Sequence, residues 1–473
     1  MRVIFSNAAA IRSKILSLLL LSFPLSNLIR AEEKNLTSQN IQSLRKNQTR
    51  VYLFDDCKGI RPKLSEKGLE FTFNYTGEIF SNLSGGLSGR TGSVYTGLWE
   101  MGAEIDAEKL FNWQGGKARL SSFYSHGSSL TQKYLGDLNT VSNIDDYDSL
   151  SLFELWIEQN FFEDKLSIRV GQMAADEEFL QNEYSSYLIN AAFGWPTVIT
   201  ANAKETPAYG MAGLGARIGG RWGEHFDFKV GIYEGLVDTV DAEGRSLNPH
   251  NVRWRLDDEE GLFIISEISF KFDDTDEPRG LRGDYRLGYW RHTGRHNDLR
   301  FDTAGFSLAD DGGITGNPVT GIPKSYSFNH GFYWSFGQMI YREVNGKSSN
   351  EGLGFFFRGG LCPEKNRSLV PYAFDFGWAY KGLFPNRSED WLVMGYTIAF
   401  ISDELRELEN DRETLTGEEV PKSSFEGVWE MSYLLQVNPY FSLQPCLQYI
   451  VNPGGFKDRE DAVVVGLRLA LSF

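Results

Sequence analysis

Charged and aromatic side chains recur at every second position in the segment FELWIEQNFFEDKLSIRVGQ. Glu154, Trp156 and Glu158 alternate with apolar residues, and Arg169 follows in the next run of the same kind. Residues two apart in an extended strand lie on one face, so these side chains point the same way. Carboxylates and guanidinium groups hydrogen-bond to hydroxyls, and aromatic rings stack on the C–H faces of sugars. The pattern therefore suits a neutral, hydroxyl-rich solute.

A face of this kind, opposite an apolar stripe, recurs along the chain with nearly equal numbers of acidic and basic residues. A phosphate channel would need a basic lining and a cation channel an acidic one, so the balance favours an uncharged solute. The excess of 63 Asp and Glu over 47 Lys and Arg falls mostly between these runs. The candidate lining and solute-binding residues are Arg119, Glu154, Trp156, Glu158, Arg169, Asp176, Arg217, Glu267, Arg286, Trp290 and Arg358.

The segment AVVVGLRLALSF (462–473) shows which elements must carry these faces. Large apolar residues from Val463 to Phe473 alternate with residues that are mostly small or polar, which is the period of a strand with two different faces. The run is about twice the usual 5–6 residues of a soluble strand. It reaches the roughly 9–11 residues needed to cross a bilayer. We therefore predict a membrane strand with its odd-numbered side chains toward lipid.

The links between such runs alternate in length. Short links such as 161–165 and 223–225 alternate with long polar links such as 174–210 and 294–328. Short periplasmic turns and long external loops on an even number of strands are typical of an outer-membrane barrel, whose closure leaves no unpaired edge in hydrocarbon. The sixteen predicted strands lie near 69–79, 94–107, 117–126, 152–160, 166–173, 211–222, 225–235, 262–272, 284–293, 329–342, 352–361, 371–381, 391–401, 426–437, 440–451 and 462–473.

The fold class expected is all-β: a 16-stranded antiparallel transmembrane β-barrel with a short, partly helical N-terminal periplasmic segment. A secreted β-sandwich or propeller is the alternative, but it would have shorter strands and links of one kind. A barrel of about 16–18 strands leaves an aqueous channel, so a pore is the default function. For any single candidate residue, plain hydration or bracing of the wall by ion pairs competes with solute contact.

The long link 174–210 is too apolar for a free external loop, because it contains Phe179, Leu180 and Phe193. We expect it to fold into the barrel and narrow it. Folding inward would bring Asp176 and its acidic neighbours toward the wall arginines. A cap over the mouth or a contact between subunits is the alternative.

The N-terminus reads as an export signal. An apolar run follows basic residues and ends near Ala31, so we predict a signal peptide at 1–31, a periplasmic segment at 32–67 and a barrel at 68–473. The chain has a formal net charge of −16, and an acidic exported protein is a poor candidate for nucleic-acid binding. The three distant cysteines match neither a disulfide scaffold nor a zinc site.

Motifs of soluble enzymes are missing. The sequence contains no H-E-x-x-H, G-x-S-x-G or P-loop. His292 and His296 are the closest pair of histidines, but they fall at a strand end, so we interpret the pair as incidental. No catalytic residue, metal or cofactor is expected.

Across roughly residues 52–473 the chain resembles the carbohydrate-selective porins of the OprB type. The resemblance lies in the entry stretch LFDDCKGIRPKLSEKGLEFTFNYTGEIFSN, the central block FELWIEQNFFEDKLSIRVGQMAADEEF, KGLFPNRSED, and the closing LQPCLQYIVNPGG. The matching positions are Gly59, Arg61, Leu64, Gly68, Tyr75, Glu154, Trp156, Gln159, Gly171, Gln172, Asp176 and Phe179.

The resemblance implies passive, facilitated diffusion of mono- and oligosaccharides across the outer membrane of a diderm bacterium. A general or weakly ion-selective porin on the same scaffold is the alternative, and an outer-membrane enzyme or adhesin anchored by the barrel is a third hypothesis. The partners expected are sugars, outer-membrane lipid and the barrel-assembly machinery, which would recognise Phe473. The sequence leaves the oligomeric state open, and a homotrimer is one option because wide porins are often trimers.

Overall fold

The computed structural model describes residues 52–473 except 204, 242–244, 255–259, 273–279, 314 and 344–350. The predicted signal peptide, 1–31, lies outside the described residues, as does most of the predicted periplasmic segment, 32–67. Both stay predictions.

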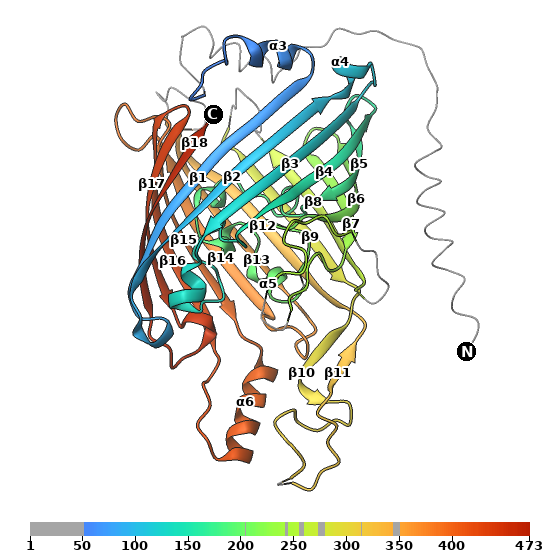
Figure 1. The fold of residues 1–473 in the computed structure, drawn as a ribbon, viewed down its shortest axis with the longest axis vertical. Coiled ribbons are helices and arrows are strands. Elements are labelled where there is room, and N and C mark those ends of the chain that lie inside the picture. The colour runs from blue at the N-terminus through green and yellow to red at the C-terminus, as the bar shows by residue number, and fades with distance from the viewer. Residues whose placement is uncertain are drawn as a thin grey trace, which may run out of the picture. The chain divides into compact units, whose positions relative to one another are not determined.

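Sixteen strands close into one antiparallel barrel (Figure 1). Strands that are consecutive in the sequence are hydrogen-bonded neighbours from β1 to β9 and from β12 to β18. The barrel is completed by the pairing of β9 with β12 and of β18 with β1. The predicted sixteen-stranded barrel is confirmed. The strands are β1 (Leu69–Ser84), β2 (Gly92–Asp106), β3 (Gly116–Gly127), β4 (Ser149–Phe161), β5 (Leu166–Met173), β6 (Gly213–Trp222), β7 (Phe226–Glu234), β8 (Leu262–Phe272), β9 (Gly283–His292), β12 (Asn329–Arg342), β13 (Gly352–Leu361), β14 (Tyr372–Lys381), β15 (Trp391–Phe400), β16 (Phe425–Asn438), β17 (Phe441–Val451) and β18 (Ala462–Ser472).

The barrel wall has an apolar outer face and a polar inner face. Ile79 of β1 and Leu467 of β18 are partners in the register, and their side chains are 55% and 45% exposed on the outside. The next pair along these strands, Glu78 and Arg468, forms an inward ion pair of 2.5 Å. Exposed apolar residues and enclosed charges are what a lipid exterior and a polar interior require. The outward side predicted for the last strand is confirmed.

The two ends of the barrel differ. One end has tight turns, including 162–165 and 223–225, together with the short helices α3 (Ile60–Glu66) and α4 (Ala107–Phe111) (Figure 1). The other end has the long links. The remaining helical turns lie in those links and are η1 (Leu87–Gly89), η2 (Thr131–Leu135), η3 (Ser185–Tyr187), η4 (Ala191–Phe193), α5 (Thr197–Thr200) and η5 (Pro453–Gly455).

Three elements beyond the barrel were not predicted. A hairpin of β10 (His296–Asp302) and β11 (Pro323–Tyr326) and the helix α6 (Asp403–Thr416) extend past the end that carries the long links (Figure 1). They dock on one another, because Asp411 of α6 accepts hydrogen bonds from Arg300 at 2.9 Å and from Ser307 at 2.7 Å. Among the described residues, no helix is long and apolar enough to span a membrane.

The described N-terminal residues cover the seam where β1 meets β18. The N–H of Leu53 donates to the carbonyl of Ser472 at 2.8 Å. Arg61 of α3 donates to the carbonyl oxygens of Phe473 and, at 3.2 Å, of Phe71, and its guanidinium lies 3.9 Å from the ring of Tyr52. The segment therefore ties the first strand to the last.

Candidate functional site in the barrel lumen

Inward side chains of β3 to β6 form a connected polar network. The strand register places Arg119 beside Trp156, Glu158 beside Arg169, and Arg169 beside Arg217. Two arginines directly across from each other repel and would destabilise the pair of strands. Carboxylates must therefore lie close to Arg169 and Arg217.

Two glutamates neutralise this arginine pair. Glu158 lies 2.9 Å from Arg169 and 2.7 Å from Arg217. Glu178, from the long link between β5 and β6, lies 2.5 Å from each of the two arginines. The guanidinium of Arg169 also lies 3.7 Å from the ring of Trp156, a cation–π contact. We call Glu158, Arg169, Glu178 and Arg217 the charge quartet; it presents donors and acceptors with no net charge.

A second group lies beside the quartet on β2 to β4. Arg119 lies within 3.0 Å of Glu104, 3.2 Å of Glu154 and 3.8 Å of Glu100. The side chain of Glu104 is 56% exposed, so this part of the lumen is open to water.

Asp176 lies at the start of the long link, and its side chain contacts the backbone near the end of the same link. Its carboxylate accepts the N–H of Tyr209 at 2.8 Å. Burial raises the pKa of the Asp176 carboxyl, and the neighbouring charges of Glu177 and Glu154 raise it further. No ion pair joins Asp176 to an arginine among the described residues, and the acidic residue of the link that contacts Arg169 and Arg217 is Glu178.

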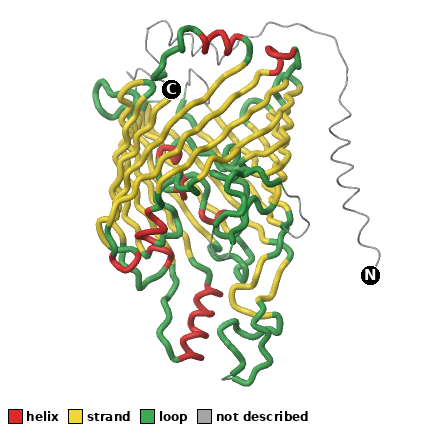
Figure 2. Tube along the Cα trace, viewed as in Figure 1, coloured by secondary structure: helices red, strands yellow, loops and turns green. Residues whose placement is uncertain are grey.

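The link 174–212 runs inside the barrel. Its side chains Phe179, Leu180 and Phe193 are almost completely buried, and they pack against inward residues of several strands. Figure 2 shows loop and short helical segments among the strands at the height of the wall. Burying such a side chain is favourable by roughly 1.5–3 kcal/mol, so the apolar composition that marked the link explains its position.

Wall side chains hold the backbone of this link. Glu267 of β8 accepts the N–H of Leu180 at 2.8 Å, and Glu430 of β16 accepts the N–H groups of Ile189 and Asn190, both at 2.7 Å. Arg358 of β13 donates to the link as well, including a bond to the carbonyl of Gly194 at 3.0 Å. A buried loop needs such partners because its backbone groups have lost water.

A second link, between β3 and β4, also enters the lumen. Its Asn143 donates from the backbone to the carbonyl of Ile189 at 2.8 Å, and Thr140 accepts the N–H of Ala191 at 3.0 Å. Ser142 donates to the wall residue Glu78 at 2.6 Å. The two links are thus joined to each other inside the barrel.

The predicted site residues divide into two groups. Arg119, Glu154, Trp156, Glu158, Arg169, Asp176 and Arg217 lie in or beside the charge quartet. The other four lie under the link: Trp290 and Arg358 are fully buried, and Arg286 pairs with Glu267 at 3.3 Å. The structure therefore places Trp290 away from open solvent, among residues that support the link.

Sequence reasoning missed Glu426 of β16 as an inward residue that holds the links. It is fully buried and accepts the N–H groups of Leu138, Asn139 and Gly454 at 2.6–2.7 Å. The sequence does contain a signal for such an acceptor. A glutamate lies on the inner face of a strand, and the links are apolar enough to fold inward and bring their N–H groups near it.

No group of three or more His, Cys, Asp or Glu within the described residues could hold a metal ion. His292 and His296 lie 3.0 Å apart and are buried, and His292 also donates to the carbonyl of Gly235 at 2.6 Å. Cys57, Cys362 and Cys446 are free thiols.

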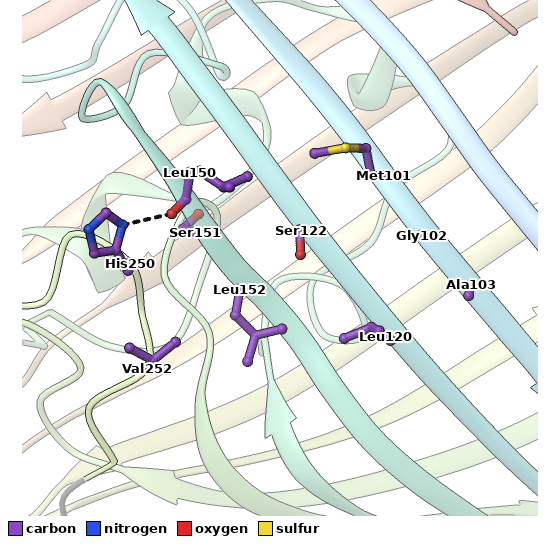
Figure 3. Close-up of a pocket in the computed structure, with 10 residues that line it drawn as sticks. All are labelled: Met101, Gly102, Ala103, Leu120, Ser122, Leu150, Ser151, Leu152, His250 and Val252. Atoms are coloured by element: carbon purple, nitrogen blue, oxygen red, sulfur yellow. Dashed lines mark hydrogen bonds between the residues drawn. The ribbon is translucent and has the colours of Figure 1, made fainter.

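A pocket on the outer wall is separate from the lumen. It is lined by β2, β3 and β4 and by residues 250 and 252 (Figure 3). Leu120 and Leu150 in this pocket belong to the exposed, lipid-facing set. The N–H of Leu152 donates to the carbonyl of His250 at 3.0 Å, and the ring of His250 donates to the carbonyl of Leu150 at 2.8 Å. This segment completes the wall beside β4.

The chain is similar to known channels over most of its length. The model of a family described as carbohydrate-selective porin, OprB family, matches residues 90–473. Porin B of Pseudomonas aeruginosa is 24% identical over 442 residues, which cover 89% of this chain and 91% of that protein. Putative porin QuiX of Acinetobacter baylyi is 24% identical over 466 residues, covering 90% and 94%. The high-pH structure of Pseudomonas putida OprB superposes with a TM-score of 0.79 at 24% identity, covering 90% of this chain and 99% of that one, and shows the same fold.

Proposed function

The chain belongs to the OprB family of carbohydrate-selective porins and is a sugar-selective channel of the outer membrane; from this premise we propose that sugars cross it passively, past the charge quartet. The single observation that carries the proposal is the pairing of Arg169 and Arg217 with Glu158 and Glu178 inside the barrel. Such a surface offers hydroxyl groups both donors and acceptors without attracting either sign of ion.

The link that carries Glu178 supplies one side of this filter. Because the link is pinned to β8, β13 and β16 by Glu267, Arg358 and Glu430, Glu178 is held in a fixed place relative to the wall arginines. We propose that Trp156, under Arg169, and Arg119, beside the quartet, extend the sugar path. Glu267, Arg286, Trp290 and Arg358 act through the position of the link.

The predicted organisation of the precursor is part of the proposal. Residues 1–31 direct export and are removed, residues 32–67 form a periplasmic segment, and residues 68–473 form the barrel. We further propose that the barrel-assembly machinery recognises the strand that ends in Phe473. A homotrimer is the assembly to compare with a monomer, by native mass spectrometry of the protein in detergent.

The function is tested by liposome swelling with glucose, sucrose and a zwitterion of similar size. We expect the sugars to enter faster than the zwitterion, because the charge quartet offers neutral hydroxyl groups complementary partners. Equal rates for all three solutes would contradict sugar selectivity and favour a general porin.

A measurement of ion selectivity distinguishes the sugar-selective channel from an ion-selective porin on the same scaffold. In a planar bilayer with a salt gradient, a neutral quartet gives a reversal potential near zero, and added sugar reduces the current. A large reversal potential of either sign would show that one charge set dominates the lumen, and would favour an ion-selective porin.

Replacing Arg169 by Ala should weaken the block of ion current by sugar several-fold while changing barrel stability little. The variant removes one guanidinium and exposes the ring of Trp156, whereas Arg217 keeps both glutamates. Breaking an enclosed ion pair is costly when it leaves a charge without a partner, and here both carboxylates keep Arg217, so we expect a small loss of stability. The measurement is sugar-dependent current noise, with the thermal unfolding temperature as the second readout.

Arg221→Ala is the matched control. Arg221 is on β6, the strand that pairs with the β5 of Arg169, but its side chain is 65% exposed and its partner is Asp227 at 3.4 Å, outside the quartet. If the two variants lose sugar block equally, Arg169 has no special part in solute contact.

A further inference from the structure

Basic and aromatic side chains alternate on the outside of the barrel where β9 ends and β12 begins. The guanidinium of Arg291 lies 4.5 Å from the ring centre of Phe328, and that of Arg367 lies 4.9 Å from the same ring. Arg367 is also 4.4 Å from the ring of Tyr326, above which Lys324 lies at 5.4 Å. We call these five residues the rim ladder.

The rim ladder borders the lipid-facing surface. Arg291 is paired in register with His330, and both share the outward parity of Leu287 and Phe332, which are 56% and 47% exposed. Three of the ladder residues, Lys324, Tyr326 and Phe328, belong to the long link 293–328, so the ladder lies at the external end of the barrel. Its position is therefore the boundary between the apolar band and the outer solvent.

The ladder carries uncompensated positive charge. Arg291 and Lys324 are exposed and form no ion pair with any described residue. Arg367 has a partner in Glu364 at 3.0 Å. The nearby Asp298 is buried and is occupied by the hydroxyl of Tyr326 at 2.9 Å and by backbone N–H groups. Two free cations at one place on a chain of net charge −16 call for an anionic partner.

We propose that the rim ladder binds the phosphate groups of a phosphorylated glycolipid in the outer leaflet. Phosphate attracts Lys and Arg at a membrane surface, and guanidinium groups bind it through two parallel hydrogen bonds. Aromatic rings are stable at the level of the head groups. The exposed Leu287, Phe332 and Leu361 directly below would contact acyl chains, which distinguishes a lipid from a free anion.

The experiment measures binding of bisphosphorylated lipid A and of its dephosphorylated form to the full-length protein in detergent, by native mass spectrometry. The test variant is Arg291→Gln with Lys324→Gln. Arg253→Gln is the matched control, because Arg253 is an exposed cation in another external link, 235–261. Each variant is first checked for heat-modifiable migration and for sugar-dependent current, which the proposal expects to be unchanged.

We expect the wild type and the control to bind the phosphorylated lipid equally, and the double variant to bind it about tenfold less tightly, which is the scale of one or two cations at an anionic surface. Equal binding of the two lipids by the wild type overturns the proposal without the need for any variant. An equal loss in the control overturns the assignment to the ladder. Displacement of the lipid by millimolar inorganic phosphate would show that the ligand is a soluble anion. None of these results bears on sugar passage.

Discussion

Shortening the link between β5 and β6 raises single-channel conductance several-fold and removes most of the discrimination between sugars. The change replaces residues 183–200 by a short Gly-Ser linker and keeps Glu178 in the chain. The expected effect is large because the removed residues include Phe193, Val198 and Ile199, all buried inside the barrel, and water replaces them. Planar-bilayer conductance and liposome swelling with glucose and sucrose measure the change.

Barrel stability must be followed in the same variant. Removing the link leaves Arg358 and Glu430 without the backbone partners they have now. A buried polar group without a partner costs about 1–3 kcal/mol, but water entering the wider lumen can hydrate both side chains. We therefore expect a lower unfolding temperature and a barrel that still forms. Thermal unfolding followed by circular dichroism is the measurement.

A deletion of similar length in the link 303–321 is the matched control. That segment joins β10 to β11 beyond the barrel (Figure 1), so its loss leaves conductance unchanged. If shortening 183–200 also leaves conductance and sugar block unchanged, the link between β3 and β4, whose Thr140 and Asn143 lie against it, sets the constriction instead.

The strands were predictable because lipid and lumen impose opposite demands on successive residues. β8 and β13 have the bounds expected from alternation alone. β12 has the expected bounds too, although aromatic residues lie on both of its faces. Phe332 faces lipid, whereas Tyr333 is buried beneath the inward link and donates to Glu267 at 3.3 Å. An apolar plug inside the barrel therefore explains an apolar inner face.

The helix α6 was missed although its limits are marked in the sequence. Ser402 accepts the N–H of Glu404 at 3.3 Å as the N-cap, and Gly417 ends the helix with φ of 70°. Caps of this kind indicate helix ends. The segment between them is strongly acidic, a composition that is also typical of a polar external loop.

The partners of the inward links could not be predicted. Alternation shows that Glu267 and Glu430 face inward, and the apolar content of the link predicts that it is buried. Neither pattern contains the register between link and wall, which decides whether a glutamate binds an arginine, an N–H group or water. The charge quartet was accessible in part, since the arginines lie on paired strands, but the choice of Glu178 over Asp176 depends on where the link turns.

Phe473→Ala should sharply reduce the amount of folded barrel in the outer membrane while synthesis continues. The ring of Phe473 lies 5.5 Å from Phe54, 5.3 Å from Phe73 and 5.4 Å from Trp99, between ring centres. Losing most of a large apolar side chain from such a cluster costs about 2 kcal/mol. The same residue is the proposed contact of the assembly machinery, so stability and insertion would fall together. Heat-modifiable migration of membrane fractions is the measurement.

Arg61→Ala separates these two effects. Arg61 donates to the carbonyl of Phe473 only once the N-terminal segment covers the seam between β1 and β18, so it acts on the finished barrel. We expect Arg61→Ala to lower the unfolding temperature and to leave the inserted amount near that of the wild type. Refolding of Phe473→Ala into detergent, where no assembly machinery is present, completes the comparison. If Phe473→Ala refolds as efficiently as the wild type and is still lost from the membrane, recognition during insertion is its main role; if it refolds as poorly as it inserts, the aromatic cluster alone accounts for the loss.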